Sequence, residues 1–244
     1  MTIEEFKSFP KDSEYDQKFI TALFTELTNS IPKLKEFRDK VEKEVWGFGE
    51  RAFLSMYKMI LESVDSEIDI LPKKCLEIGV YKGQILVAWK IISEIIGMYV
   101  DVYGITPLDS TDGHIESDYL NDIHRLHDYY GCEYPKIIKG QSQDPNIVST
   151  AKKNMPYDVL FIDGHHGYEE VKEDLRNYPQ MVKKGGYLII DDSANYIKGT
   201  YWGAFWGIES VSKAVDELLP PKTQNNDWEY IGNVVHNRIW RRIN

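Results

Sequence analysis

The chain has 244 residues, of which 42% are hydrophobic and 28% charged, so it can bury one sizeable core. Its formal net charge of -10 at pH 7 argues against a nucleic-acid partner, because proteins that bind phosphate backbones usually carry a basic face. The N-terminus is acidic and polar, and the longest apolar stretch is interrupted by Lys90 and Glu94. We therefore expect neither a secretory signal nor a membrane span, and a cytoplasmic location.

Residues 1–70 show the apolar spacing of helices and few strand signals. Segments 14–27, 30–45 and 49–64 repeat apolar residues at intervals of three and four, and Ser30 is expected to cap the second helix before Pro32. Glycines in WGFGE predict a break between helices. We expect a helical extension over residues 1–70 and a catalytic domain over residues 71–244. The extension could also serve as the interface of a homodimer.

From residue 74 onward, short apolar runs alternate with amphipathic stretches. This order is typical of βαβ units, which build a mostly parallel sheet with right-handed crossovers. The runs VLFI and YLII are apolar throughout, which favours strands covered on both faces. The closing segment WEYIGNVVHNRIWRR predicts an antiparallel hairpin that turns at Gly232 and Asn233. Together these patterns predict an α/β fold with a doubly wound, Rossmann-like, seven-stranded sheet.

A glycine-containing loop follows the first predicted strand. CLEIGVYKGQ places Glu77, Gly79 and Gly83 between a strand and a helix, where open α/β sheets bind ligands. A tight turn without a ligand would use the same glycines. The loop is not the G-x-G-x-x-G pattern of dinucleotide-binding proteins, because Tyr81 stands where the middle glycine would be. This disfavours a nicotinamide-dependent oxidoreductase.

With VYGITPLDS, IIKGQSQDP and the segment 157–192, this loop resembles the pattern of class I S-adenosylmethionine-dependent methyltransferases. It is similar in particular to cation-dependent O-methyltransferases that act on sugar hydroxyls in antibiotic and surface-glycan pathways. The resemblance covers residues 74–242 and is most specific over 157–192. It implies S-adenosylmethionine as the cofactor, with its methionine part on the first loop beside Glu77, Gly79, Tyr81 and Gly83.

Two further strand ends depart from the family pattern. The family usually has an acidic residue at the end of the second strand, which holds the ribose hydroxyls, and this chain has Thr106. A neutral hydroxyl lacks the charge-assisted component of such a hydrogen bond, and Asp109 could replace it. After the third strand the family often has G-D-S. Here the resemblance implies that Gln141 and Ser142 face the adenine.

Three aspartates follow the fourth and fifth predicted strands: Asp163, Asp191 and Asp192. These strands are neighbours in this topology, about 4.8 Å apart, so the aspartates should converge. Carboxylates so close repel one another unless protons or a cation neutralise them. Each could instead cap a helix, but the three together favour a hard divalent cation such as Mg²⁺, with Mn²⁺ and Ca²⁺ as alternatives. The resemblance implies the same ligands, and Asp163 is also expected beside the cofactor.

His165 and His166 follow the first of these aspartates. A neutral histidine could remove the proton of a cation-bound hydroxyl, and the resulting oxyanion would attack the sulfonium methyl group. One branch of the family uses a histidine three residues after the aspartate, which is His166. Another branch uses an aspartate two residues after it, where this chain has His165. We favour His166 as the base.

The predicted function is therefore cation-dependent O-methylation of a sugar, glycoside or other polar small molecule. Aromatic residues in two segments, 107–131 and 194–210, suit a wall against a sugar ring. A nicotinamide-dependent oxidoreductase and a non-catalytic nucleotide-binding or assembly module are the alternatives. For the second alternative, Thr106 and Gln141 in place of acidic residues are the supporting features.

Overall fold

The computed structural model describes residues 1–11, 13–64, 71–108, 119–197, 205–219 and 227–244. Its strands form one seven-stranded sheet in the order β3-β2-β1-β4-β5-β7-β6. The first five strands are parallel, and β7 is antiparallel to β5 and β6, which confirms the predicted fold. The strands are β1 Lys73–Ile78, β2 Val100–Thr106, β3 Lys136–Lys139, β4 Tyr157–Ile162, β5 Val182–Ile190, β6 Trp228–Val234 and β7 Asn237–Arg242.

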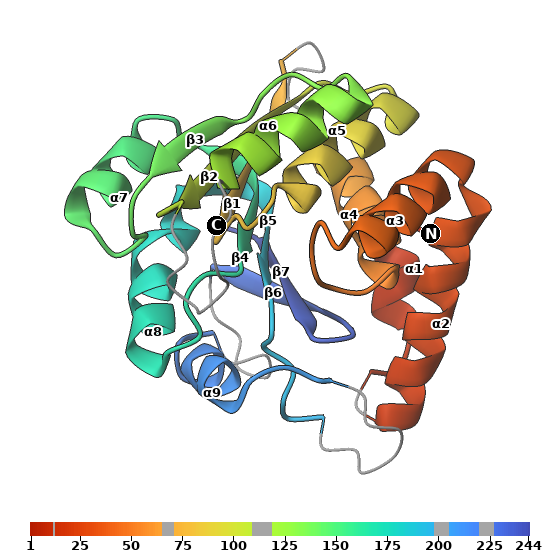
Figure 1. Cartoon of the computed structure of the whole chain (residues 1–244). Helices are drawn as coiled ribbons and strands as arrows, with labels where there is room; N and C mark the ends of the chain where they lie inside the picture. The colour runs from red at the N-terminus through yellow and green to blue at the C-terminus, as the bar shows by residue number, and fades with distance from the viewer. Residues whose placement is uncertain (12, 65–70, 109–118, 198–204, 220–226) are drawn as a thin grey trace.

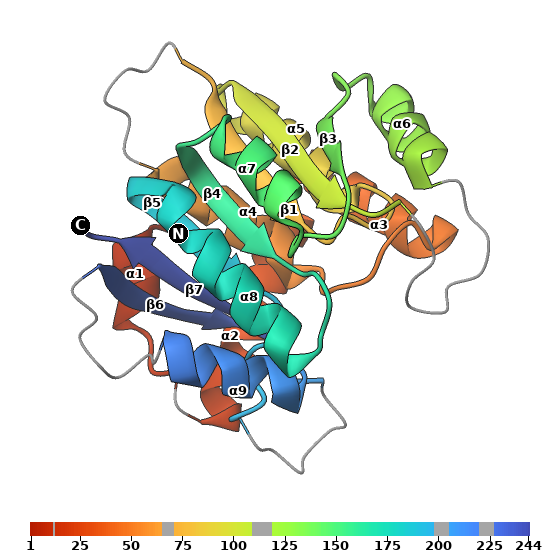
Figure 2. The same ribbon diagram turned by 90° about the vertical axis from the view of Figure 1, so that its left-hand side faces the viewer.

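Helices cover both faces of the sheet, with α7, α8 and α9 on one face and α1 to α6 on the other (Figures 1 and 2). None of the described helices is long and apolar enough to cross a lipid bilayer. The helices are α1 Ile3–Ser8, α2 Glu14–Ser30, α3 Pro32–Glu44, α4 Ala52–Ser63, α5 Gln84–Ile96, α6 Tyr119–Tyr130, α7 Pro145–Lys152, α8 Tyr168–Asn177 and α9 Glu209–Leu218, with a 3₁₀ turn at Pro179–Met181.

The central strands are buried on both faces, as their continuous apolar sequence predicts. Every residue of β4 is buried, and so are the last six of β5. Alternate residues of β4 enter different cores: Phe161 packs with the N-terminal helices, and Leu160 packs beneath α8 and α9. The N-terminal helices therefore share a hydrophobic core with the sheet. The division predicted at residue 70 lies in a stretch outside the described residues and stays a prediction.

Local signals in the sequence explain where several helices begin. Helix α2 begins after Ser13, whose hydroxyl accepts a hydrogen bond from the backbone of Asp16, while the Asp16 carboxylate accepts one from the backbone of Ser13. The cap predicted at Ser30 is wrong, because Ser30 is the last residue of α2 and Ile31 precedes α3. Pro32 nonetheless occupies the first turn of α3, where its missing N–H costs nothing.

The predicted turn of the C-terminal hairpin is also wrong. Gly232 and Asn233 lie within β6, where the pairing shifts by a bulge, and the chain turns at Val235 and His236. Glycine at a bulge gives the same sequence signal as glycine at a turn. The shift matters for the site, because the turn places His236 beside the end of β5.

Candidate active site

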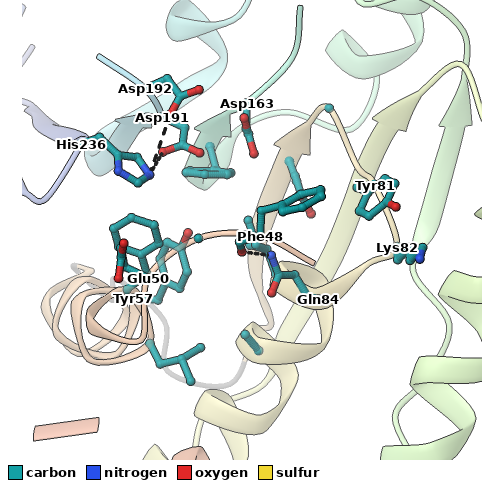
Figure 3. A pocket seen from close by; sticks show the side chains of 18 of the residues that line it. Phe48, Glu50, Tyr57, Tyr81, Lys82, Gln84, Asp163, Asp191, Asp192 and His236 are labelled. Carbon is teal, nitrogen blue, oxygen red and sulfur yellow. Dashed lines mark hydrogen bonds and ion pairs between the residues drawn. The ribbon is translucent and has the colours of Figure 1, made fainter. Parts of the chain in front are cut away.

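The ends of β4 and β5 bring three aspartates together. Ile162 pairs with Ile190 at the last step of the two strands, so Asp163 and Asp191 follow at the same level. The backbone ladder continues there, because the N–H of Asp163 donates to the carbonyl of Ile78 (2.8 Å) and the N–H of Asp191 donates to that of Ile162 (3.0 Å). Figure 3 shows Asp163, Asp191 and Asp192 at one edge of the cavity.

His236 completes this cluster from the hairpin turn, and the sequence reasoning missed it. Its Nε2 lies 3.2 Å from Asp191 Oδ1 and 3.8 Å from Asp192 Oδ1. The register of β5 with β7 explains the contact, because Ile190 pairs with Arg238 and the next residues continue the antiparallel ladder, with Ser193 N–H donating to the carbonyl of His236 (2.9 Å). Placing the hairpin turn at Val235 and His236 in the sequence would have predicted this histidine beside the end of β5.

Burial and mutual repulsion set the charges of this cluster. Burial, together with the charge of Asp191, raises the pKa of Asp192 to about 6, and the same causes with Asp192 added raise the pKa of Asp163. Burial lowers the pKa of His236, but the charges of Asp191, Asp192 and Asp163 outweigh it and raise this pKa to about 9. Among the described residues, Asp191, Asp192 and His236 offer ligand atoms within 4.8 Å of one another. The donor set therefore fits a divalent cation.

The two adjacent histidines point to different surroundings. His166 lines the cavity, with Nε2 at 3.5 Å from Asp192 Oδ2 and 3.7 Å from Asp163 Oδ1. His165 is half exposed, its Nδ1 accepts the N–H of Gly167 (3.0 Å), and it lies 3.8 Å from Glu170. His165 is not among the residues that line the cavity. Of the two candidate bases, the structure thus brings His166 to the aspartates.

The first glycine loop lies directly beside the acidic cluster. Gly79 has a φ of 96°, and a Cβ on it would stand 1.7 Å from the carbonyl oxygen of Asp163, so the loop and the end of β4 approach as closely as only glycine allows. Glu77 is 3% exposed, and its Oε2 has no partner among the described residues. Burial, followed by the charges of Asp163 and Asp191, raises the pKa of Glu77 well above its ordinary value.

The cavity has a volume of about 360 Å³, within the usual range for small-molecule sites. One wall is the edge of the sheet with Glu77, Gly79, Tyr81 and Gly83, and the other comes from α3, α4 and the loop between them. That loop crosses the first glycine loop, where Phe48 stacks on Tyr81 with ring centroids 5.5 Å apart (Figure 3).

Other predicted cofactor residues lie at the same sheet edge but outside this cavity. Thr106 ends β2, is 3% exposed and accepts the N–H of Leu108 (3.2 Å). Asp109 lies outside the described residues. Gln141 is exposed after β3, and Ser142 is buried, with its carbonyl accepting the hydroxyl of Tyr178 (2.6 Å). Their contact with adenine or ribose stays a prediction.

Comparisons with known proteins agree with this arrangement. Residues 76–193 match a family described as methyltransferase domain. An uncharacterized protein of Acanthamoeba polyphaga mimivirus is 36% identical over 75 residues, which are 31% of this chain and 32% of that protein. The match spans about a third of that relative's length.

Two solved structures share the fold. A TDP-rhamnose 3′-O-methyltransferase of calicheamicin biosynthesis has a TM-score of 0.55 and 14% identity, over 96% of this chain and 97% of that one. A methyltransferase of the mycinamycin pathway, solved with Mg and SAH, has a TM-score of 0.53 and 19% identity, over 85% of this chain and 54% of that one.

The matched residues run from β1 to the end of β5, and so include the glycine loop and all three aspartates. Residues 76–193 are therefore similar in sequence to methyltransferase domains, and the chain shares its fold with solved methyltransferases.

Proposed function

We propose that the protein transfers a methyl group from S-adenosylmethionine to a hydroxyl of a polar small molecule of the sugar or glycoside class, in a reaction that depends on a divalent cation. The observation that carries the proposal is the convergence of Asp163, Asp191 and Asp192 with the first glycine loop in one cavity. A methyltransferase that needed only its own side chains would have little reason to gather three carboxylates there, one of them buried and two partly buried.

Asp163, Asp191 and Asp192 would hold the cation, with His236 in contact with two of them. A bound Mg²⁺ or similar ion would lower the pKa of a coordinated hydroxyl and orient it. His166 has its Nε2 between Asp163 and Asp192, where it can accept the proton of that hydroxyl. The glycine loop would hold the cofactor so that oxygen, methyl carbon and sulfur stand in line.

The aromatic side chains around the cavity support a ring-shaped acceptor. Phe205 follows the segment after β5, is 51% exposed, and lines the cavity with Phe48 and Phe53. Such faces stack on sugar rings. Trp206 is buried in the core, and Tyr201 and Trp202 lie outside the described residues. The sugar methyltransferase with the same fold supports this substrate class.

The direct test is methyl transfer from labelled S-adenosylmethionine to a panel of nucleoside-diphosphate sugars, glycosides and catechols, measured with Mg²⁺, Mn²⁺ or Ca²⁺ and with EDTA. We expect transfer to a sugar-type hydroxyl that EDTA abolishes and a divalent cation restores. Transfer that is equal with and without EDTA would refute the cation-dependent mechanism. Transfer to catechols alone would refute the substrate class and leave the mechanism standing.

A further inference from the structure

A buried arginine from the N-terminal helices lies on the cavity wall opposite the sheet. Arg38 belongs to α3, is 8% exposed, and lines the same cavity as Glu77 and Gly83. Its Nε donates to Glu42 (2.8 Å), its Nη1 to Oε1 of Gln84 (3.3 Å), and its Nη2 to the carbonyl of Gly49. A guanidinium carries five N–H donors, so these three bonds leave one on Nη1 and one on Nη2. Arg38 can therefore still donate to a ligand.

Gln84 places this guanidinium at the beginning of α5. Gln84 is the first residue of that helix, and Gly83 before it provides no side-chain cap. The first backbone N–H groups of an uncapped helix attract an anion, and the helix dipole adds to this attraction. Arg38 and the beginning of α5 thus form one positive region inside a cavity whose other charged side chains include Glu50, Glu77 and the three aspartates.

Outside the cluster of aspartates and His236, two buried polar atoms on the same cavity have no partner among the described residues. They are Oε2 of Glu77 and the hydroxyl of Tyr57, on residues that are 3% and 2% exposed. Buried polar atoms are nearly always hydrogen-bonded in native proteins, so these atoms indicate a polar ligand. Glu77 needs a donor, and a cationic one would also offset the buried charge.

We propose that Arg38 binds the α-carboxylate of the methionine end of S-adenosylmethionine, and that Glu77 accepts a hydrogen bond from its α-ammonium group. This inference rests on the proposed function only through the cofactor, and it adds Arg38 from the N-terminal helices to the residues that hold it. The opposite charges of Arg38 and Glu77 match those of an amino acid. The cofactor site is then incomplete without α3, so residues before the matched domain contribute to cofactor affinity.

Three ligands with a neutral sulfur test this assignment by calorimetry on the full chain: S-adenosylhomocysteine, its decarboxylated form S-adenosyl-3-thiopropylamine, and 5′-methylthioadenosine. The second lacks the carboxylate, and the third lacks both the carboxylate and the ammonium group. For Arg38→Gln we expect affinity for S-adenosylhomocysteine to fall roughly tenfold to a hundredfold, the range of a lost charge-assisted hydrogen bond. Affinity for the other two ligands should stay near that of the wild type.

Glu77→Gln should give a different pattern, with weaker binding of the two ligands that carry the ammonium group and unchanged binding of 5′-methylthioadenosine. Arg38→Lys, which keeps the charge, should recover part of the preference for the carboxylate. Two further variants test the neighbouring cations, and neither should change the preference for the carboxylate. Arg51→Gln removes a neighbouring arginine that pairs with Asp39 and Glu42, and Lys82→Gln removes the cation beside Tyr81 (Figure 3).

The comparison within one variant separates binding from folding, because a purely structural loss weakens all three ligands by the same factor. If Arg38→Gln lowers the affinities for S-adenosylhomocysteine and its decarboxylated form equally, the assignment of Arg38 is wrong. If Lys82→Gln alone removes the preference for the carboxylate, the assignment is also wrong. Failure of the wild type to bind any of the three ligands would overturn both this inference and the cofactor on which it rests.

Discussion

Nε2 of His236 lies 3.2 Å from Oδ1 of Asp191, across the antiparallel pairing of β5 with β7. The histidine is 5% exposed, and its ring meets Phe53 and Phe205 edge-on at 4.9 and 5.2 Å between centroids. In the metal-free protein, the imidazolium is therefore the buried counter-charge of the aspartate cluster. A cation bound to the same carboxylates would take over this role.

This contact predicts that the metal-free protein loses stability between pH 7 and 9. The pKa of His236 is raised to about 9 in the folded protein, so the folded state holds a proton that the unfolded state releases near its ordinary value of 6.5. The stabilising contribution is complete below that value and disappears as the pH rises through 9, with a loss on the order of 2 kcal/mol.

Urea unfolding at pH 7, 8 and 9 in EDTA measures this loss. His236→Asn is the control, because its free energy of unfolding should change less over this pH interval. A wild type whose stability changes no more than that of His236→Asn over this interval would show that the ion pair with Asp191 and Asp192 is absent in solution.

The two adjacent histidines should differ in catalysis. His166 lies 3.5 Å from Asp192 inside the cavity, whereas His165 faces Glu170 outside it. With the acceptor found in the transfer assay, His166→Asn should lower kcat by about 10²–10⁴ while the affinity for S-adenosylhomocysteine is unchanged, because the lost step is proton removal. His165→Asn should keep kcat within a few-fold of the wild type. The reverse order of the two kcat values would assign the base to His165.

Gly79→Ala should lower the free energy of unfolding by more than the positive φ of Gly79 alone explains, because the added Cβ would meet the end of β4. Gly97 is the matched control, because it also has a positive φ but a Cβ on it meets nothing within 4 Å, whereas a Cβ at Gly79 meets the carbonyl of Asp163. We expect Gly97→Ala to cost about 1–2 kcal/mol, and Gly79→Ala to cost a further 1–3 kcal/mol.

Thermal unfolding and calorimetry with S-adenosylhomocysteine measure the two consequences, and Gly79→Ala should also weaken binding of this ligand. Equal unfolding free energies for the two variants would mean that the first glycine loop does not lie against the end of β4.

The sequence predicts the sheet well because its signals are local and repeated. Fully apolar runs at β4 and β5 predict buried parallel strands, and the parallel order then places Asp163 and Asp191 together without any knowledge of side-chain geometry. Gly232 was misleading, because the same residue suits a bulge or a turn. His236 was missed for that reason, since its position depends on the register of the hairpin.

The sequence does not predict the contribution of Arg38 to the cavity. Arg38 looks in the sequence like one of many charged residues on an amphipathic helix, and its burial follows only from the packing of α3 against α5. Glu77 could be assigned to the cofactor loop by resemblance. The lack of a partner for its Oε2 is a property of the three-dimensional structure.

Titration of Mn²⁺ into the protein loaded with S-adenosylhomocysteine, followed by calorimetry, measures cation binding at the three aspartates. We expect one bound ion in the wild type, loss of at least about tenfold in affinity in Asp191→Asn, and no loss in Asp101→Asn, which removes an aspartate paired with Lys136 at the start of β2. Equal affinities in the wild type and Asp191→Asn, or no bound ion in the wild type, would show that these aspartates do not hold a cation.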